Sequence, residues 1–337
     1  MKKKIYIWAN DLSNFTGEGI LANKFINIIK KNNYIHIISP LYNGEYNRKI
    51  INKKFNTSAL PKLNNIFNKY FVQFLGIINL WVFFFKKEKI AYINYLPLWN
   101  FIIFALLPPK TFLGPITGTN DDPQHRSWTR RCLIPIFKKI SFYIISKRQK
   151  SLLFSTDLQI KEFDIKSFDK ILYNFVLIDF KIFRTKEKKR KFDLLVYYKK
   201  HNNKNNEFHA QLIKKLNLYN YKIAIIGDKI KINNVVNFGF VNRDIVLKIL
   251  KNTKFIINSG ENLYTLFALD AVKSGTYVFF NKKYKKNLSD LRSNLFIPLD
   301  FSNLDKSLNK ILKFKKTKNS IIFKRRDFSS YFKQILY

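Results

Sequence analysis

The sequence predicts an α/β protein that contains two doubly wound parallel-sheet domains. Short β-rich runs alternate along the chain with segments whose apolar residues have helical spacing. This alternation stops at a charge run at 181–191 and then restarts. The length of 337 residues suits two domains that each bury a core of their own.

The first half begins with a β-type run at 4–9, a polar turn at 10–19 and a helical pattern at 20–29. A second strand follows at 35–39, which completes one βαβ unit. The alternation then continues with strands expected at 91–95, 111–113 and 152–155 and helices at 97–107 and 128–146. This order predicts a parallel sheet with helices on both faces.

The second half repeats the pattern, and the junction is expected just before or within the charge run. Strands are expected at 192–198, 222–226, 235–238, 255–258 and 276–280, and helices at 206–216, 243–252, 266–274 and 303–314. We therefore place the domains at 1–175 and 176–318. A terminal helix within 319–337 is expected to cross back to the first domain.

The composition limits the classes of function. Lys and Arg number 62 against 22 Asp and Glu, a formal charge of +40, and 47% of residues are hydrophobic, too many for a disordered polyelectrolyte. The single cysteine, Cys132, allows no internal disulfide, and with four scattered histidines it predicts no metal site. A reducing compartment fits this cysteine usage, and no metal or other cofactor is expected.

The charge predicts a polyanionic partner, either an anionic membrane or nucleic acid, and we rank the membrane first. The apolar segment at 71–85 is shorter than the roughly 20 residues of a spanning helix, so it is expected to be a buried or interfacial helix. The few apolar residues after the initial lysines do not form an export signal. Helices at 70–85 and 97–107 are either core helices or a membrane-facing surface.

The most informative segment is 259–275, SGENLYTLFALDAVKSG, in which a polar turn follows a strand and Gly275 ends a helix. It resembles the donor-sugar motif of family-four retaining GT-B glycosyltransferases: an acid, seven residues, a second acid and a helix of small residues. The resemblance puts Asp270 in the place of the ribose-binding acid. The sugar-binding acid falls on Asn262, with Glu261 one residue earlier, and either of these two residues is a candidate for that role.

Two further patterns agree with this resemblance. The amino end of the helix would offer backbone N–H groups to the donor diphosphate, and these come from Leu263, Tyr264, Thr265 and Leu266. Lys199 and Lys204 have the spacing of the family's two pyrophosphate-binding cations, whose charge stabilises the leaving diphosphate. The segments at 222–227 and 236–241 resemble a pair of strands in the family whose second loop meets the nucleotide base, and the resemblance implies that Phe240 and Val241 flank the base. The likeness covers about 192–312.

The first half carries weaker signals. Gly17 and Gly19 resemble the family's glycine loop, where donor phosphate or acceptor approaches the backbone. The absence of the remaining dinucleotide glycine disfavours an NAD enzyme. The loop GPITGTNDDPQHR at 114–126 resembles a loop of some members and is either the acceptor side of the site or a solvated turn. Its candidate acceptor residues are Asp121, Asp122, His125 and Arg126.

The resemblance implies two Rossmann-like domains facing across a cleft and transfer of a sugar from a nucleotide-diphosphate donor to a cell-surface glycan or lipid-linked acceptor. It implies retention of configuration, for which no protein base is needed; in an inverting enzyme Asp11, Asp121 or Asp122 would be the base. We expect a cytoplasmic protein peripheral to the inner membrane face, active in polysaccharide or lipopolysaccharide biosynthesis, with no nucleic-acid partner. The alternatives are a basic nucleic-acid-binding protein and a catalytically degenerate GT-B glycan-binding protein.

Overall fold

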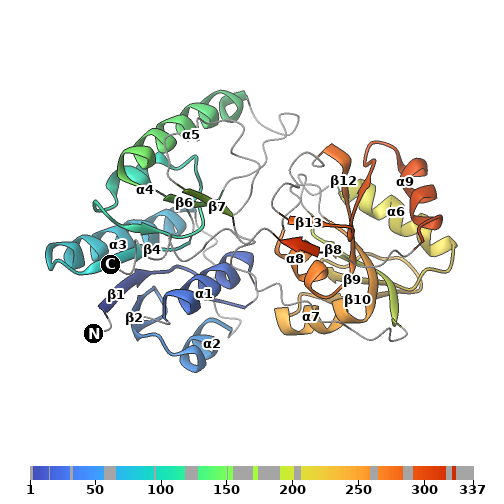
Figure 1. The fold of residues 1–337 in the computed structure, drawn as a ribbon, viewed down its shortest axis with the longest axis horizontal. Helices are drawn as coiled ribbons and strands as arrows, with labels where there is room; N and C mark the ends of the chain where they lie inside the picture. The colour runs from blue at the N-terminus through green and yellow to red at the C-terminus, as the bar shows by residue number, and fades with distance from the viewer. Residues whose placement is uncertain are drawn as a thin grey trace. The chain divides into compact units, whose positions relative to one another are not determined.

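The computed structural model describes residues 3–14, 16–30, 33–56, 66–94, 96–117, 128–149, 151–154, 170–173, 190–200, 206–258, 265–283, 291–315 and 321–323. The described residues divide into two compact units (Figure 1). The first unit holds the described residues up to 173, and the second holds those from 190 to 323. The predicted boundary at 175/176 lies outside the described residues.

The first unit is built on a five-stranded sheet in the order β3-β2-β1-β4-β5. Its strands are β1 (Lys3–Trp8), β2 (Asn33–Ile38), β3 (Asn43–Glu45), β4 (Lys89–Tyr92) and β5 (Phe112–Leu113). All pairs are parallel except β2–β3. A parallel pair, β6 (Ser151–Phe154) and β7 (Lys170–Tyr173), is joined to the region after β5 by a bridge between Ile116 and Phe154.

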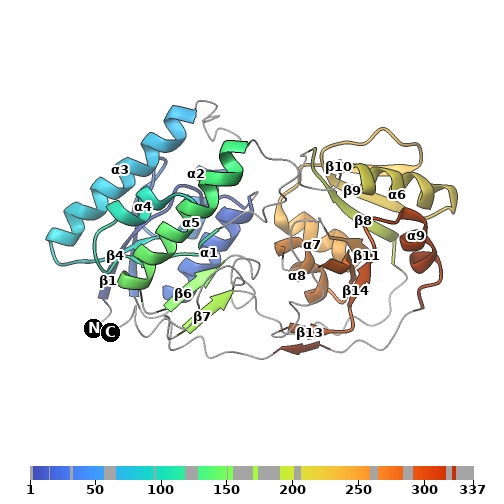
Figure 2. The same ribbon diagram turned by 90° about the horizontal axis from the view of Figure 1, so that it is seen from above.

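The helices of the first unit cover both faces of its sheet (Figure 1). On one face lie α1 (Gly17–Ile29) and α2 (Arg48–Asn56). On the other face lie α3 (Ile66–Phe85), α4 (Phe101–Leu106) and α5 (Trp128–Arg148), which share one buried cluster with the strands. Figure 2 shows these three helices as one layer, with α4 between α3 and α5. Gly76 lets the backbone of α3 rest on the Trp8 ring of β1.

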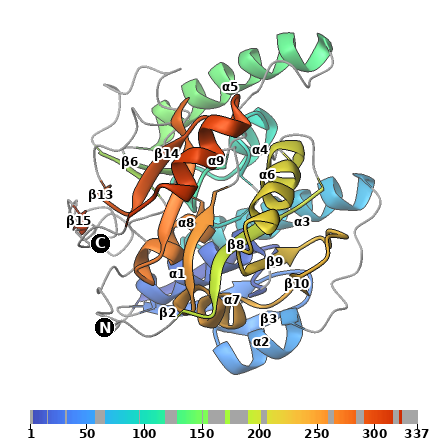
Figure 3. The same cartoon turned by 90° about the vertical axis from the view of Figure 1, so that its right-hand side faces the viewer.

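The second unit contains a six-stranded, wholly parallel sheet in the order β10-β9-β8-β11-β12-β14. Its strands are β8 (Phe192–Tyr198), β9 (Ile223–Gly227), β10 (Val235–Gly239), β11 (Thr253–Ile257), β12 (Tyr277–Asn281) and β14 (Phe296–Leu299). On one face lie α6 (Asn206–Leu218) and α9 (Leu304–Leu312), and on the other α7 (Arg243–Lys251) and α8 (Leu266–Lys273) (Figures 2 and 3). A small antiparallel pair joins β13 (Leu291–Ser293) to β15 (Ile321–Phe323).

The predicted fold class is confirmed: both units are α/β with doubly wound parallel sheets. The helix expected at 97–107 is shorter, because Pro97 and Leu98 pair with Thr117 instead of entering the helix. Residues 321–323, at the beginning of the predicted terminal helix, form a strand. The remainder of that segment, 324–337, lies outside the described residues. Among the described helices, none has both the length and the hydropathy required to cross a bilayer.

Candidate functional site

The strand order locates the most favourable binding position in the second unit. The chain runs from β8 outward to β9 and β10 on one side and then returns to place β11 on the other side of β8. In open parallel sheets, ligands bind outside the carboxyl ends of the strands where the order reverses in this way. The candidate site therefore lies beyond β8 and β11, next to Lys199 and Asn258.

A neutral polar pair holds the amino end of α8 at this position. Asn258 directly follows β11 and is only 1% exposed. Thr265, the N-cap of α8, donates its hydroxyl to Asn258 Oδ1 at 2.7 Å and accepts from the backbone N–H of Ala268 at 3.1 Å. The first turn of α8 contains no acidic residue, so the positive end of its dipole is not neutralised by its own helix. Such a helix end favours an anionic ligand group.

Asp270 lies in α8 and is engaged by an arginine that the sequence analysis did not single out. Arg243 Nε donates to Asp270 Oδ2 at 2.9 Å, and Arg243 Nη2 donates to Asp270 Oδ1 at 2.5 Å. The Asp270 side chain is 4% exposed and that of Arg243 is 21% exposed. Asn242 caps α7 by accepting from the N–H of Ile245, which places Arg243 in the first turn of that helix. The pair thus ties α7 to α8, and ribose binding by Asp270 stays a prediction.

The end of β8 presents two neighbouring lysines. Both Lys199 and Lys200 are exposed. The backbone N–H of Lys200 donates to Asp228 Oδ2 at 2.7 Å, so the loop after β8 is held by the loop after β9. Gly227 has φ of +98°, and a side chain there would meet the Tyr198 carbonyl oxygen. This close approach holds the backbone next to Lys199 at the edge of the sheet.

The loop after β10 presents an aromatic ring. Gly239 adopts φ of +68°, and the following Phe240 is 68% exposed while Val241 is half-buried. An exposed ring at the carboxyl end of a strand could stack on a nucleotide base, as predicted for these two residues. That role stays a prediction.

At the far side of the same edge, Lys282 Nζ lies 2.5 Å from Asp300 Oδ2. Hydrogen bonds from Lys282 and from Ser302 lower the pKa of Asp300 from its ordinary 3.8 to about 2. Asp300 is therefore ionised throughout the physiological range.

The first unit closes its corresponding position with its own groups. Asn94, after β4 and 1% exposed, accepts from the N–H of Asn10 at 2.7 Å and donates to the Asp11 carbonyl. The Asp11 carboxylate, 3% exposed, accepts from the Ser13 N–H at 2.7 Å and from the hydroxyl of Thr16, the N-cap of α1. This carboxylate offsets the positive end of the α1 dipole.

Gly19 is required by that same packing. A side chain at position 19 would overlap the backbone of Ser13 and the Asp11 carboxylate. The protein itself fills the space that a glycine loop would leave for a ligand. Gly17 begins α1, and donor binding by either glycine stays a prediction.

Several predicted residues lie outside the described residues. They are Lys204, Glu261, Asn262, Leu263, Tyr264, Asp121, Asp122, His125 and Arg126. Six of the described residues predicted for the donor site belong to loops and helix ends at the carboxyl edge of the second unit's sheet, or to the helix that begins there: Lys199, Phe240, Val241, Thr265, Leu266 and Asp270. The other two, Gly17 and Gly19, lie in the first unit. Within the described residues, no cluster of three His, Cys, Asp or Glu side chains could hold a metal ion.

Three residues at these positions were missed: Asn258, Asn94 and Arg243. Each asparagine directly or almost directly follows a buried strand at a reversal of strand order, and such a polar residue is a recognisable signal once the strand order is known. No local signal identifies Arg243, because its partner lies 27 residues away.

Two doubly wound parallel sheets in one chain, each with helices on both faces, define the GT-B architecture, which confirms the predicted fold. No protein-family model matches the chain, and no curated protein matches it either. Solved structures of GT-B proteins match it over nearly its whole length at 10 to 14% identity, which shows the shared fold.

Three of these structures illustrate the likeness. Anabaena Alr3699/HepE, solved with UDP and glucose, is 10% identical over 92% of this chain and 89% of its own, with a TM-score of 0.58. WaaG, a glycosyltransferase of lipopolysaccharide biosynthesis, is 11% identical over 92% and 90%, with a TM-score of 0.56. The UDP-GlcNAc 2-epimerase of Methanocaldococcus jannaschii, solved with UDP-GlcNAc and UDP, is 14% identical over 98% and 97%, with a TM-score of 0.53.

Proposed function

We propose that the protein transfers a sugar from a nucleoside-diphosphate donor to a glycan or lipid-linked acceptor, with retention of anomeric configuration. The observation that carries the proposal is the amino end of α8, which Asn258 and Thr265 hold at the reversal of strand order in the second unit. The similar structures of HepE and of the epimerase were solved with UDP or UDP-sugars, which supports this donor class.

The donor diphosphate would be bound by backbone N–H groups of α8 and by Lys199, with Lys204 as the second cation. Negative charge grows on the diphosphate as the glycosidic bond breaks, so fixed positive groups here stabilise the transition state more than the ground state. Lysines and the helix end supply this charge, and no metal is part of the proposal.

The ribose would be bound at Asp270 while Arg243 remains in place. An ionised carboxylate offers about four acceptor positions, and Arg243 occupies two of them. In this proposal the remaining positions accept from two ribose hydroxyl groups. Arg243 is then a positioning residue that holds the buried carboxylate in one orientation through its two hydrogen bonds.

The transfer itself would need no protein nucleophile. The bond from the sugar C1 to the diphosphate oxygen breaks, the acceptor oxygen bonds to C1 on the same face, and the acceptor proton passes to the departing diphosphate. Glu261 or Asn262 would hold the sugar, and Asp121, Asp122, His125 and Arg126 would face the acceptor. We place the reaction in the cytoplasm at the inner membrane face, in assembly of a surface polysaccharide.

The direct test is a thermal-shift panel of nucleoside diphosphates and their sugars. A ligand at 100 times its Kd stabilises the native state by about 2.7 kcal/mol. Lys199→Ala should weaken nucleoside-diphosphate binding at least tenfold, whereas Lys200→Ala, at a neighbour that is also exposed, should change it less than twofold. Equal effects of the two substitutions, or retention on nucleic acid with no nucleotide binding, would overturn the proposal.

A second candidate is epimerisation of the nucleotide sugar, because the similar epimerase covers 98% of this chain. The two reactions differ in their products. A transferase with its acceptor releases nucleoside diphosphate in proportion to glycoside formed. An epimerase changes the sugar of the donor without acceptor and with no net release of nucleotide, which anion-exchange chromatography of the donor pool would detect.

A further inference from the structure

The outward side of α3 in the first unit is apolar. Its exposed side chains recur at positions that share one helix face, and they are Phe71, Phe74, Leu75, Ile78, Val82 and Phe85. The opposite side of the helix carries the buried Ile77 and Leu80, which pack in the core. The helix therefore has an apolar face toward the core and a second apolar face toward solvent.

The neighbouring helices continue this outward surface. On α4, Ile102 and Leu106 are each 44% exposed. On α5 the exposed apolar side chains are Trp128, Leu133, Ile136, Ile140 and Tyr143. Because α4 lies between α3 and α5 in one layer (Figure 2), these side chains and those of α3 form one surface, which we call the apolar face. It holds 13 of the 21 large apolar side chains that are exposed in the described residues.

All the formal charge on these three helices is positive. Their sequences contain seven Lys and Arg and no Asp or Glu. Arg131, Lys139 and Lys147 of α5 are exposed among the residues of the apolar face. Lysine and arginine can extend their charged ends to a lipid headgroup while their stems lie against apolar surface.

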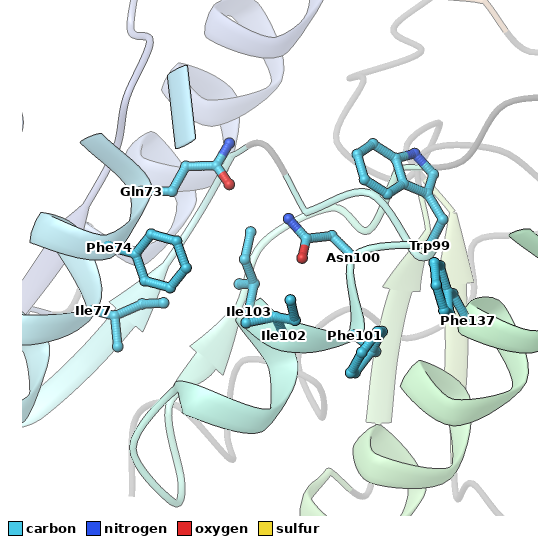
Figure 4. Close-up of a pocket in the computed structure, with 9 residues that line it drawn as sticks. All are labelled: Gln73, Phe74, Ile77, Trp99, Asn100, Phe101, Ile102, Ile103 and Phe137. Carbon is cyan, nitrogen blue, oxygen red and sulfur yellow. The ribbon is translucent and has the colours of Figure 1, made fainter. Parts of the chain in front are cut away.

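A pocket of about 180 Å³ opens among α3, α4 and α5. Phe74 and Ile77 of α3 line one wall, and Ile102 and Ile103 of α4 line the facing wall (Figure 4). The side chains of Gln73 and Asn100 point toward one another across it (Figure 4). Gln73 is 5% exposed, and its Oε1 accepts no hydrogen bond from the part of the chain that the structure describes. The pocket thus combines apolar walls with one buried, unused acceptor.

We infer that the apolar face docks on an anionic lipid bilayer and that the pocket receives part of one lipid chain from it. An apolar face bordered by cations lies in the interface, with side chains about 5–10 Å into the headgroup and acyl boundary. Trp128 and Tyr143 have the amphipathic rings that favour this boundary. The inference deepens the proposed function, whose membrane location it rests on, by naming the docking surface; it does not depend on the donor chemistry.

Two other occupants fit less well. A second copy of the face would bring the exposed Arg131, Lys139 and Lys147 near the same cations of its partner, a like-charge juxtaposition that opposes association. Nucleic acid would pair with the cations but would leave the apolar side chains of α3 in water. An anionic bilayer satisfies both the charge and the apolar surface.

Flotation of the full chain with vesicles tests the docking. We expect binding to vesicles of phosphatidylglycerol and phosphatidylcholine to exceed binding to phosphatidylcholine alone at least tenfold. Ile78→Glu with Ile136→Glu should reduce binding at least tenfold, whereas Leu218→Glu, at the 81% exposed end of α6, should change it less than twofold. Unchanged thermal unfolding and an unchanged nucleoside-diphosphate shift would show that the variants are folded.

Two results would overturn the docking inference. One is equal vesicle binding by the wild type and the double variant. The other is a dimer in vesicle-free sedimentation that the double variant converts to monomer, because the face would then be an interface between copies. If the wild type binds vesicles but no nucleoside diphosphate, the proposed function is refuted and the docking inference stands.

Tryptophan quenching tests the pocket. Trp99 lines it and Trp128 lies on the face, so vesicles of phosphatidylglycerol brominated on the acyl chains should quench the fluorescence of both. Trp99→Phe and Trp128→Phe should each remove part of the quenching. If Trp99→Phe leaves the quenched fraction unchanged, no lipid chain enters the pocket.

Discussion

The two units have the same sheet design but different outer helix surfaces. In each, the first strand lies in the sheet interior and the chain fills one side before returning to the other. In the first unit, α3, α4 and α5 expose 13 large apolar side chains. In the second unit, the large apolar side chains exposed on α6, α7, α8 and α9 are Leu218 and Ile245. The sheet needs only the inward face of each helix, so the outward face is available for a separate role.

The strand ends differ as well. In the first unit the carboxylate of Asp11 accepts from the loop and from the cap of α1. In the second unit the cap of α8 is bonded to the neutral Asn258. An anionic ligand would meet a like charge in the first unit, whereas in the second it would meet a helix end whose own first turn holds no acidic residue. This difference is why we assign the donor to the second unit.

The largest effect is expected at the pair between α7 and α8. Arg243→Ala would leave the buried Asp270 carboxylate without its cation, which should lower the free energy of unfolding by about 3 kcal/mol. Lys248→Ala, at an exposed position of the same helix, should have almost no effect. Urea unfolding measures both, and equal stability of the two variants would remove the pair as a structural tie.

The two faces of α3 allow a sharper comparison. Ile77→Ala should cost about 2.5 kcal/mol, because its side chain is 4% exposed and a cavity would remain. Ile78→Ala, at a residue 60% exposed, should cost less than about 0.5 kcal/mol. If Ile78→Ala costs as much as Ile77→Ala, the outward face is covered in solution.

Substitutions of the two buried asparagines, Asn94 and Asn258, should have smaller effects on the free energy of unfolding. Asn94→Ala removes hydrogen bonds to both Asn10 and Asp11, so we expect a loss of about 2 kcal/mol. Asn258→Ala removes the bond that Asn258 accepts from Thr265, but the Thr265 hydroxyl still caps α8, so we expect a loss of about 1 kcal/mol. If chemical denaturation shows a larger loss for Asn258→Ala than for Asn94→Ala, the loop that Asn94 holds after β1 is less important to stability than we expect.

The smallest effect concerns pH. The folded-state pKa of Asp300 is about 2, below its ordinary 3.8, so its contribution to stability is present above pH 3.8 and is lost as the pH falls toward 2. Asp300→Asn should remove this pH dependence and leave the rest of the profile unchanged. The measurement is the melting temperature of the wild type and of Asp300→Asn between pH 5 and 2. If the two melting temperatures fall in parallel as the pH is lowered, the prediction is wrong.

The sequence was sufficient for the fold because its apolar periodicity follows the sheet faces directly. Residues 192–198 were expected as a strand and form β8 with the same bounds. Helix α2 was missed because its apolar signal consists mainly of Ile51 and Phe55, both buried. The beginning of α4 was misplaced because the pairing of Pro97 with Thr117 is a long-range contact.

The site was harder to predict. Thr265 directly precedes the apolar run of α8, where threonine is a typical N-cap residue, and the structure gives it that role. The engagement of Asp270 by Arg243 depends on the packing of α7 against α8, which local spacing does not contain. The outward face of α3 was also not predictable, because a helix that is apolar on several sides does not indicate in its sequence which side the core will cover.

The contact between Gly76 and the Trp8 ring has a consequence for the whole of α3. Any larger residue at position 76 would have to lift the helix from β1 or turn it about its long axis. A turn of that kind would carry Phe74 and Ile78 sideways and bring polar neighbours such as Asn79 into their place. A single hydrogen atom in place of a methyl group therefore sets the rotational phase of α3, and with it the set of side chains that the helix exposes on its outward side.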